Sequence, residues 1–507
     1  MIDIYIEAIY WNIDEDELQL KQMEGLNSIS TGKVESTNYF TASEFRKLQG
    51  IDDVNPMFII DDYIKKFDTG NVLQLRFLAD YMRKPVEQVV SLLLRLASKG
   101  FLIYDADAEI AYINDRFKAV LGAKAGKLDY DVIQINTTTA KKQANLLLNL
   151  KSFDLKMSGI EEVILSETQG VQIFPDRKEI IMKKNRDFVF SGLIKAGLFD
   201  FYARDAAFEY DPFKLNFSFV DSLSFVVKLR EQPKNATKIE YIRVKNVLAD
   251  LTGTLYIDEP ANKSGKKNIA HFPVFSSKSE CYVYYEKPDI QQGALKKDDF
   301  FYVIDPFEID SLDNFSTDNL RFSGYLTSAE IFPVFREPLV VMKDYSLGFD
   351  HNLPKEGYEM FTDKAHYFNT IHLSNAGFQG LGQLDYQTGT AFSKQFIFYP
   401  DSVLALLDRF DMREREQSVE FPQGFADQID FEWKVDSNIV TLTTISNPYH
   451  VFTDANFSGK INISPNGMIG AGTLEFGKAQ VKSNDYSFLS RAFHADTADF
   501  RLFPDQG

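Results

Sequence analysis

The side chains that could do chemistry in this sequence are carboxylates, serines and six histidines. The histidines are scattered and form neither His-Glu-x-x-His nor another close metal-binding pattern. The two nearest in sequence are His366 and His372, and we expect both to be polar residues on a strand face. The chain also lacks a Gly-x-Ser-x-Gly nucleophile elbow and a P-loop. We therefore predict no catalytic residue, although an acid pair of the glycosidase type remains open because carboxylates are plentiful.

The spacing Gly377-x-x-Gly380-x-Gly382 is superficially that of a phosphate-cradling loop. Such a loop requires a strand before it and a helix after it, so that the helix N-terminus meets the phosphate. Here strand-like alternation continues through residues 383–386, and the same glycine spacing recurs 90 residues later. We predict glycines that serve tight turns or bulges between strands, and no cofactor-binding residue.

Metal and thiol chemistry is poorly supported by the sequence. Cys281 is the only cysteine, so no disulfide within the chain and no thiolate cluster can form. We predict a buried strand residue at that position. The acidic segments 14–17 and 105–109 resemble partial calcium loops, but they lack the glycine and the terminal acid at EF-hand spacing. No metal ligand is predicted.

Composition excludes some classes of function and favours one class of fold. The net charge of −18 disfavours binding to nucleic acid, which needs a basic face. The densest basic run, residues 263–267, is predicted to be a solvated turn. Aromatic residues make up 14% of the chain, with 45 Phe and 24 Tyr, and these residues favour β-strands. There is no 18-residue apolar stretch, so no transmembrane helix is expected.

A helical region precedes the strands. Apolar residues recur at helical spacing in 75–82 and again in 86–96, Gly100 follows, and 101–104 and 109–113 have the composition of two strands. This order resembles a winged helix. The outer face of the second helix carries one acid and two cations, a poor set for reading a DNA groove, so we expect a structural or protein-contact module. The residues of that face are Glu87, Gln88, Ser91, Arg95, Ser98 and Lys99.

From about residue 130 onward, short strands alternate with turn residues, and residues 402–410 are the main helical candidate. Residues 371–386 align without a gap with residues 461–476, and we call these two regions the first and second copies. In this alignment Asn462 replaces His372. The predicted fold is mainly β (α+β overall), a repetitive antiparallel, solenoid-like β array with a small helical winged-helix-like subdomain near the N-terminus. The predicted domains are an N-terminal β segment (1–56), the helical subdomain (57–125), a β-rich domain (126–350) and a β-rich domain with the repeat (351–507).

Strand-glycine-strand units in residues 180–220 and 371–500, ending in Asp496-Thr-Ala-Asp-Phe500, resemble segments of very large uncharacterised cell-envelope or exported proteins of the Bacteroidota type. They are also loosely similar to the amphipathic β arrays of bacterial lipid-bridging envelope proteins. The resemblance implies an envelope or exported setting and assigns no role to any residue. The low cysteine content fits the cytoplasm equally well.

These observations predict a non-enzymatic structural or interaction protein of the cell envelope, an elongated scaffold or adhesin segment. Two alternatives stay open: a lipid or hydrophobic-ligand carrier with an apolar β groove, and a glycan-binding protein or carbohydrate-active enzyme. Protein partners or neighbouring domains of a longer chain are expected, because residues 1–8 and 503–507 have the character of cut ends. No cofactor and no nucleic-acid partner is expected.

Overall fold

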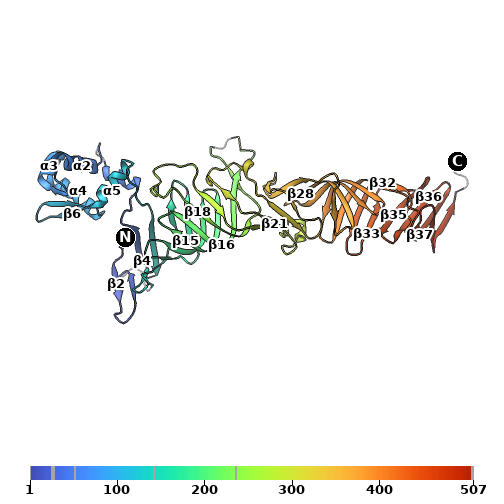
Figure 1. Ribbon diagram of the computed structural model, residues 1–507, viewed down its shortest axis with the longest axis horizontal. Helices are drawn as coiled ribbons and strands as arrows, with labels where there is room; N and C mark the ends of the chain where they lie inside the picture. The colour runs from blue at the N-terminus through green and yellow to red at the C-terminus, as the bar shows by residue number, and fades with distance from the viewer. Residues whose placement is uncertain (1, 24–28, 51–52, 141–142, 235–236, 504–507) are drawn as a thin grey trace. The chain divides into compact units, whose positions relative to one another are not determined.

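The computed structural model describes residues 2–23, 29–50, 53–140, 143–234 and 237–503 (Figure 1). The fold is mainly β, with large antiparallel sheets, as the sequence predicted. The chain divides into two compact units. The first comprises residues 1–225, 249–279 and 306–315, and the second comprises 226–248, 280–305 and 316–507. The four predicted domains remain a prediction, and residues 504–507 of the expected cut end lie outside the described residues.

The N-terminal helices belong to the first unit. Helices α3 (Leu75–Met82) and α4 (Val86–Ser98) are followed by the hairpin of β6 (Leu102–Asp105) and β7 (Ile110–Ile113), in the predicted order. Gly100 lies between α4 and β6 with φ 73°, a left-handed conformation that glycine adopts without a steric penalty. Strand β5 (Val72–Gln74) pairs with β7 and completes a three-stranded sheet. The remaining helices are α1 (Ala42–Gln49), α2 (Pro56–Phe67) and α5 (Asp115–Lys124).

Aromatic residues stabilise the β part of the first unit. Strands β14 (Phe188–Ala196), β15 (Phe199–Glu209) and β16 (Lys214–Lys228) form consecutive antiparallel pairs. Cross-strand partners stack their rings: the centroids of Phe188 and Phe208 lie 4.6 Å apart. Such pairs contribute about 0.5–1.5 kcal/mol beyond their buried area. The high phenylalanine content therefore serves the core of the sheet.

The basic run at residues 263–267 forms a turn with Lys266 and Lys267 exposed, as the sequence predicted, and hydrogen bonds also tie this turn to distant residues. The Lys266 ammonium donates to the backbone carbonyl of Lys124 at the end of α5, and the amides of Lys263 and Ser264 donate to the Asp129 carboxylate. A cation at a helix C-terminus is favoured by the helix dipole. The sequence did not show these contacts, because the glycine and serine content of the run says nothing about which distant groups it reaches.

One large antiparallel sheet dominates the second unit (Figure 1). Its strands follow one another in nearly the order of the sequence, so most neighbours are joined by hairpins. The main path runs through β25 (Val340–Val341), β26 (Leu347–Asn352), β28 (Ala365–Ser374), β29 (Gly377–Tyr386), β30 (Gly389–Phe398), β31 (Ser402–Met412), β32 (Gly424–Lys434), β33 (Ile439–Thr444), β35 (Ala455–Ser464), β36 (Gly467–Phe476), β37 (Ala479–Phe488) and β38 (Phe493–Ala495).

The helical interpretation of residues 402–410 is wrong, because β31 covers this stretch and pairs with β30 and β32. The error has a local cause. Alternation of burial along β31 changes phase after Leu407, so the buried residues within 402–410 are Val403, Leu407 and Phe410. Their four- and three-residue spacing is that of a helix face, although the backbone is extended. Cross-strand pairing overrides the periodicity.

The two copies identified in the sequence have the same strand register. In the first, Ile371 lies opposite Gly380, and in the second Ile461 lies opposite Gly470. Each copy then shifts register by one residue before the pairs Gly382–Ser393 and Gly472–Ser483. Because Gly382 and Gly472 lie inside β29 and β36 and next to these irregularities, the glycines serve strand geometry and precede no helix.

The inner face of this sheet is filled with aromatic rings. Trp433 is fully buried on β32, with the ring centroids of Phe361 and Tyr386 at 5.2 Å and 5.4 Å. Phe396 and Phe431 meet edge to face at 6.2 Å. None of the helices among the described residues is long and apolar enough to cross a membrane.

Candidate functional site

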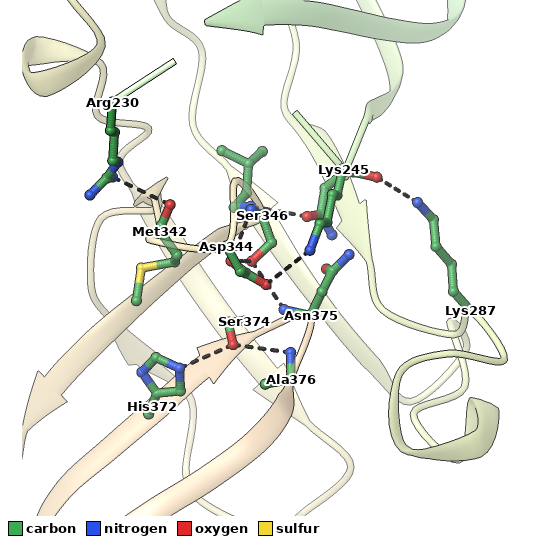
Figure 2. Close-up of polar contacts among 12 residues, drawn as sticks. Arg230, Lys245, Lys287, Met342, Asp344, Ser346, His372, Ser374, Asn375 and Ala376 are labelled. Atoms are coloured by element: carbon green, nitrogen blue, oxygen red, sulfur yellow. Dashed lines mark hydrogen bonds and ion pairs between the residues drawn. The ribbon is translucent and has the colours of Figure 1, made fainter. Parts of the chain in front are cut away.

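The most catalysis-like constellation lies where β26 and β28 pair. His372 Nδ1 lies 2.6 Å from Asp350 Oδ1, and His372 Nε2 lies 3.0 Å from Ser374 Oγ. Asp350 and His372 are direct cross-strand partners. Ser374 follows His372 by two residues on the same strand face, and Figure 2 shows the contact between these two side chains. An acid, an imidazole and a hydroxyl in this order have the connectivity of a serine-hydrolase triad.

The surroundings of Ser374 do not support nucleophilic attack. The residue is only 3% exposed, whereas the Asp350 side chain that should orient the imidazole is 66% exposed. Ser374 Oγ accepts a hydrogen bond from the backbone N–H of Ala376, and the N–H of Asn375 donates to Ser346 Oγ. Both N–H groups that follow the serine are therefore engaged and cannot stabilise an oxyanion. The hydroxyl shapes the turn between β28 and β29.

The second copy supports this structural role. Ser464 Oγ accepts from the N–H of Asn466, as Ser374 does from Ala376. The position of His372 is taken by Asn462, and its cross-strand partner is Thr441, whose hydroxyl donates to Asn462 Oδ1 at 2.9 Å. The serine turn thus exists without a histidine or a carboxylate. The prediction that His372 is a polar residue on a strand face agrees with this arrangement.

A polar network centred on the buried Ser346 joins the turn between β25 and β26 to the turn after β28 (Figure 2). The Asp344 carboxylate accepts from the N–H and hydroxyl of Ser346, and the Lys245 ammonium lies 3.6 Å away. Burial acts to raise the pKa of Asp344, but the hydrogen bonds from Ser346 and the charge of Lys245 outweigh burial and lower it. Ser346 is fully buried and accepts from Asn375, so the network joins two turns.

Further contacts hold the same edge of the sheet. The Arg230 guanidinium donates to the carbonyl of Val341 at 2.8 Å and to that of Met342 at 3.3 Å, and the Lys287 ammonium donates to the Lys245 carbonyl. Arg230 and Lys287 therefore supply hydrogen-bond donors to backbone carbonyls, and Lys245 places a cation beside the Asp344 carboxylate. We interpret the region as an anchor of the sheet.

A groove of about 660 Å³ lies on the outer face of β30 to β35. Its floor is aliphatic, from Ile397, Leu404 and Leu406, and one cross-strand row continues from Leu404 to Glu432 and Thr441. The walls carry carboxylates, hydroxyls and lysines. Such a surface can hydrogen-bond a polar ligand and bury part of its apolar area. The polar lining residues include Gln395, Asp408, Asp430, Glu432, Thr441, Thr443 and Lys460.

The helical subdomain presents an apolar row instead of a basic face. Val72, Tyr112 and Ile103 are cross-strand neighbours on β5, β7 and β6, and they are 37%, 44% and 62% exposed. On α4, Arg95 donates to the Leu48 carbonyl and Lys99 lies 3.6 Å from Glu44. Both cations of the predicted outer face therefore have partners within the chain.

The other residues considered from sequence are accounted for by local structure. Cys281 is buried in β20 (Cys281–Tyr284), as predicted, and burial raises the pKa of its thiol to about 12. Asp105 Oδ1 accepts from two N–H groups of its own turn. Glu109 forms an ion pair with Arg76 at 2.8 Å, so this acidic segment is a capped hairpin.

The proximity of Asp350 to His372 was not accessible from the sequence. The pattern His372-x-Ser374 could have indicated two side chains on one strand face, but the acid lies 22 residues earlier and depends on strand register. Comparison with protein-family models, with curated proteins and with solved structures gives no match to this chain.

Proposed function

We propose that this chain is a non-enzymatic structural and interaction protein, a β-rich scaffold or adhesin segment of the cell envelope. The observation that carries the proposal is the serine turn, in which Ser374 or Ser464 accepts a hydrogen bond from the N–H group two residues later. The only Asp–His–Ser chain of hydrogen bonds found among the described residues places its serine in a role that Ser464 performs without histidine or acid. The envelope setting rests on the sequence resemblance of residues 180–220 and 371–500 alone.

Two features support an interaction role. The large sheet grows by hairpins that repeat the same register, which is how a solenoid-like array extends. The apolar row of Val72, Tyr112 and Ile103 supports a winged-helix-like module that contacts protein, because a solvent-exposed row of large apolar side chains is stabilised when a partner covers it. The apolar row is therefore the surface that we expect a partner to cover.

Packing makes the lipid-carrier alternative less favourable. That alternative requires phenylalanine and tyrosine to line an open apolar groove. Trp433, Phe396 and Phe431 are instead buried and in ring contact with their neighbours. The groove on the outer face of β30 to β35 has charged and hydroxyl-bearing walls, which suit a lipid chain poorly.

Glycan binding is a second candidate, and the outer groove favours it. Asp430 and Glu432 lie on the same face of β32, and Thr441 and Thr443 lie beside them on β33. Carboxylates and hydroxyls can pair with sugar hydroxyl groups, and the aliphatic floor can cover a sugar face. A glycan array with the wild-type protein and with Asp430→Ala is the direct test, and equal, flat signals from both proteins would contradict this candidate.

The non-enzymatic character can be tested with a fluorophosphonate probe, which labels activated serines. We expect no labelling of Ser374 by intact mass spectrometry, so that neither the wild-type protein nor Ser374→Ala gains the mass of the probe. Labelling that is lost in Ser374→Ala and in His372→Asn would show an activated nucleophile and would overturn the proposal.

The interaction surface can be tested with a double variant, Ile103→Ser with Tyr112→Ser. Affinity capture followed by quantitative mass spectrometry should recover proteins with the wild-type chain that the double variant loses. Leu381→Ser is the matched control, because Leu381 is 48% exposed on a different sheet. Identical recovery by the double variant and the control would exclude this surface as the contact.

A further inference from the structure

Three potential metal ligands meet on the hairpin of β27 (Tyr358–Met360) and β28. They are Glu359, Asp363 and His366, and one ligand atom from each lies within 4.8 Å of the other two. Glu359 and His366 are direct cross-strand partners, and Asp363 lies in the turn that joins the two strands. The strands therefore fix two of the three side chains relative to one another.

The donor set is one imidazole nitrogen and two carboxylate oxygens. Zn²⁺ is bound by such ligands at about 2.0–2.2 Å, so two ligand atoms of one ion lie at most about 4.4 Å apart. Side chains whose ligand atoms already lie within 4.8 Å need only small rotations to reach that geometry. The imidazole nitrogen favours a first-row divalent transition metal over Ca²⁺ or Mg²⁺, which prefer oxygen ligands.

The two carboxylates of this cluster carry negative charge that no ion pair among the described residues offsets. Asp385 is the cross-strand neighbour of His366 on β29, and its carboxylate accepts a hydrogen bond from the Gln383 amide. Within the described part of the chain, neither Glu359 nor Asp363 forms an ion pair with lysine or arginine. Lys364 lies next to Asp363 in sequence, but its ammonium donates to the Val435 carbonyl. Carboxylates that cluster without a cation repel one another, and a bound divalent cation relieves that repulsion.

The hairpin that precedes the second copy provides a natural comparison. This hairpin, formed by β34 (Tyr449–Val451) and β35, places His450 opposite Asn456. At the equivalent positions before the first copy, β27 and β28 place Glu359 opposite His366. The acid is thus replaced by histidine and the histidine by asparagine, so the three ligands are not required to form this kind of hairpin.

We infer that the β27–β28 hairpin binds one divalent transition-metal ion through His366, Glu359 and Asp363. Three protein ligands leave further coordination positions for water or for a ligand atom of another molecule. The site lies at the surface, because Glu359 and Asp363 are exposed and His366 is half-buried. The inference concerns the chain's own ligands and holds whether or not the chain is an interaction protein.

The first test measures Zn²⁺ binding to the full chain after chelator treatment and dialysis, with a chromophoric zinc indicator as competitor. We expect the wild-type protein to bind one equivalent at least about ten-fold more tightly than His366→Asn, which carries the residue found at Asn456. His494→Asn is the matched control, because His494 also lies beside a carboxylate, Asp496, on an exposed strand. Equal affinity and stoichiometry in the wild-type protein and His366→Asn would overturn the inference.

Two further measurements keep the test independent of folding. The circular dichroism spectra of the variants should match that of the wild-type protein, because all three ligands lie at the surface of a hairpin. Zn²⁺ should raise the melting temperature of the wild-type protein and not that of Asp363→Asn, since a ligand that binds only the folded state stabilises it. Competition by Ca²⁺ at the same concentration as Zn²⁺ would contradict a role for the imidazole and would also overturn the inference.

Discussion

His372 and Asn462 occupy equivalent positions in two hairpins of one sheet, yet only His372 connects an acid to a serine. Each lies two residues before a serine that accepts an N–H from its own turn. His372 contacts Asp350 and Ser374, whereas Asn462 accepts from Thr441. The turn therefore requires only the serine hydroxyl. The imidazole of His372 and the carboxylate of Asp350 are additions at the first copy.

Replacement of the turn serines should therefore destabilise the protein in both copies. Ser374→Ala removes the acceptor for Ala376 and a partner of His372, and we expect a loss of about 1–2 kcal/mol in the free energy of unfolding. Ser464→Ala, at a less buried position, should lose less. Urea unfolding measures both values. A Ser374→Ala protein as stable as the wild type would show that the turn does not depend on its hydroxyl.

Gly382 is the glycine whose replacement should be most damaging in the first copy. Its φ is 152°, and an added Cβ would lie 2.1 Å from the carbonyl oxygen of Phe368. We expect Gly382→Ala to lower the free energy of unfolding by more than about 2 kcal/mol. Gly477→Ala is the control, because its φ is 58° but no atom lies within 4 Å of the added Cβ, so about 1 kcal/mol is expected. Equal losses in urea unfolding would contradict the steric explanation.

Local patterns in the sequence identified two of the helices and the mainly β class. The apolar spacing of residues 75–82 and 86–96 and the glycine at position 100 correspond to α3, α4 and the end of α4. These features depend on residues that lie close together in the chain, which is why periodicity is sufficient to find them. The alignment of the two copies likewise preserved register, because the same glycines and serines occur at the same offsets.

Features that depend on distant residues were missed. The strand Ser402–Met412 was taken for a helix because a change in the phase of burial mimics helical spacing. The contact of Asp350 with His372 and the meeting of Glu359 with His366 arise from strand register. Register is set by hairpin turns and by the burial of one face, and a single sequence does not give it. The candidate metal cluster was therefore invisible, although its histidine was noted.

Trp433 tests whether the inner face of the large sheet is closely packed. Trp433→Ala should lower the free energy of unfolding by about 3–5 kcal/mol, because the fully buried indole contacts Phe361 and Tyr386. In Trp11→Phe, Trp433 is the only tryptophan, and its emission should be blue-shifted and insensitive to iodide, as in a dry environment. Trp11 itself is 52% exposed, so this change should cost little stability. Quenching of Trp433 by iodide would indicate an open groove and would revive the lipid-carrier alternative.

The Cys281 thiol should be unreactive in the folded protein, and it should make the free energy of unfolding fall at alkaline pH. Burial raises the pKa of its thiol from 9.0 to about 12, so between these values the folded state retains a proton that the unfolded state has lost. Stability is therefore complete below about pH 9 and is lost as the pH rises towards 12. The loss attributable to this thiol is at most about 1.4 kcal/mol per pH unit, and Cys281→Ala should show a correspondingly shallower decline in urea unfolding.

A disulfide reagent at pH 8 should modify Cys281 only in denaturant. Rapid modification of the native protein would show that the thiol is accessible and that the strand Cys281–Tyr284 opens readily.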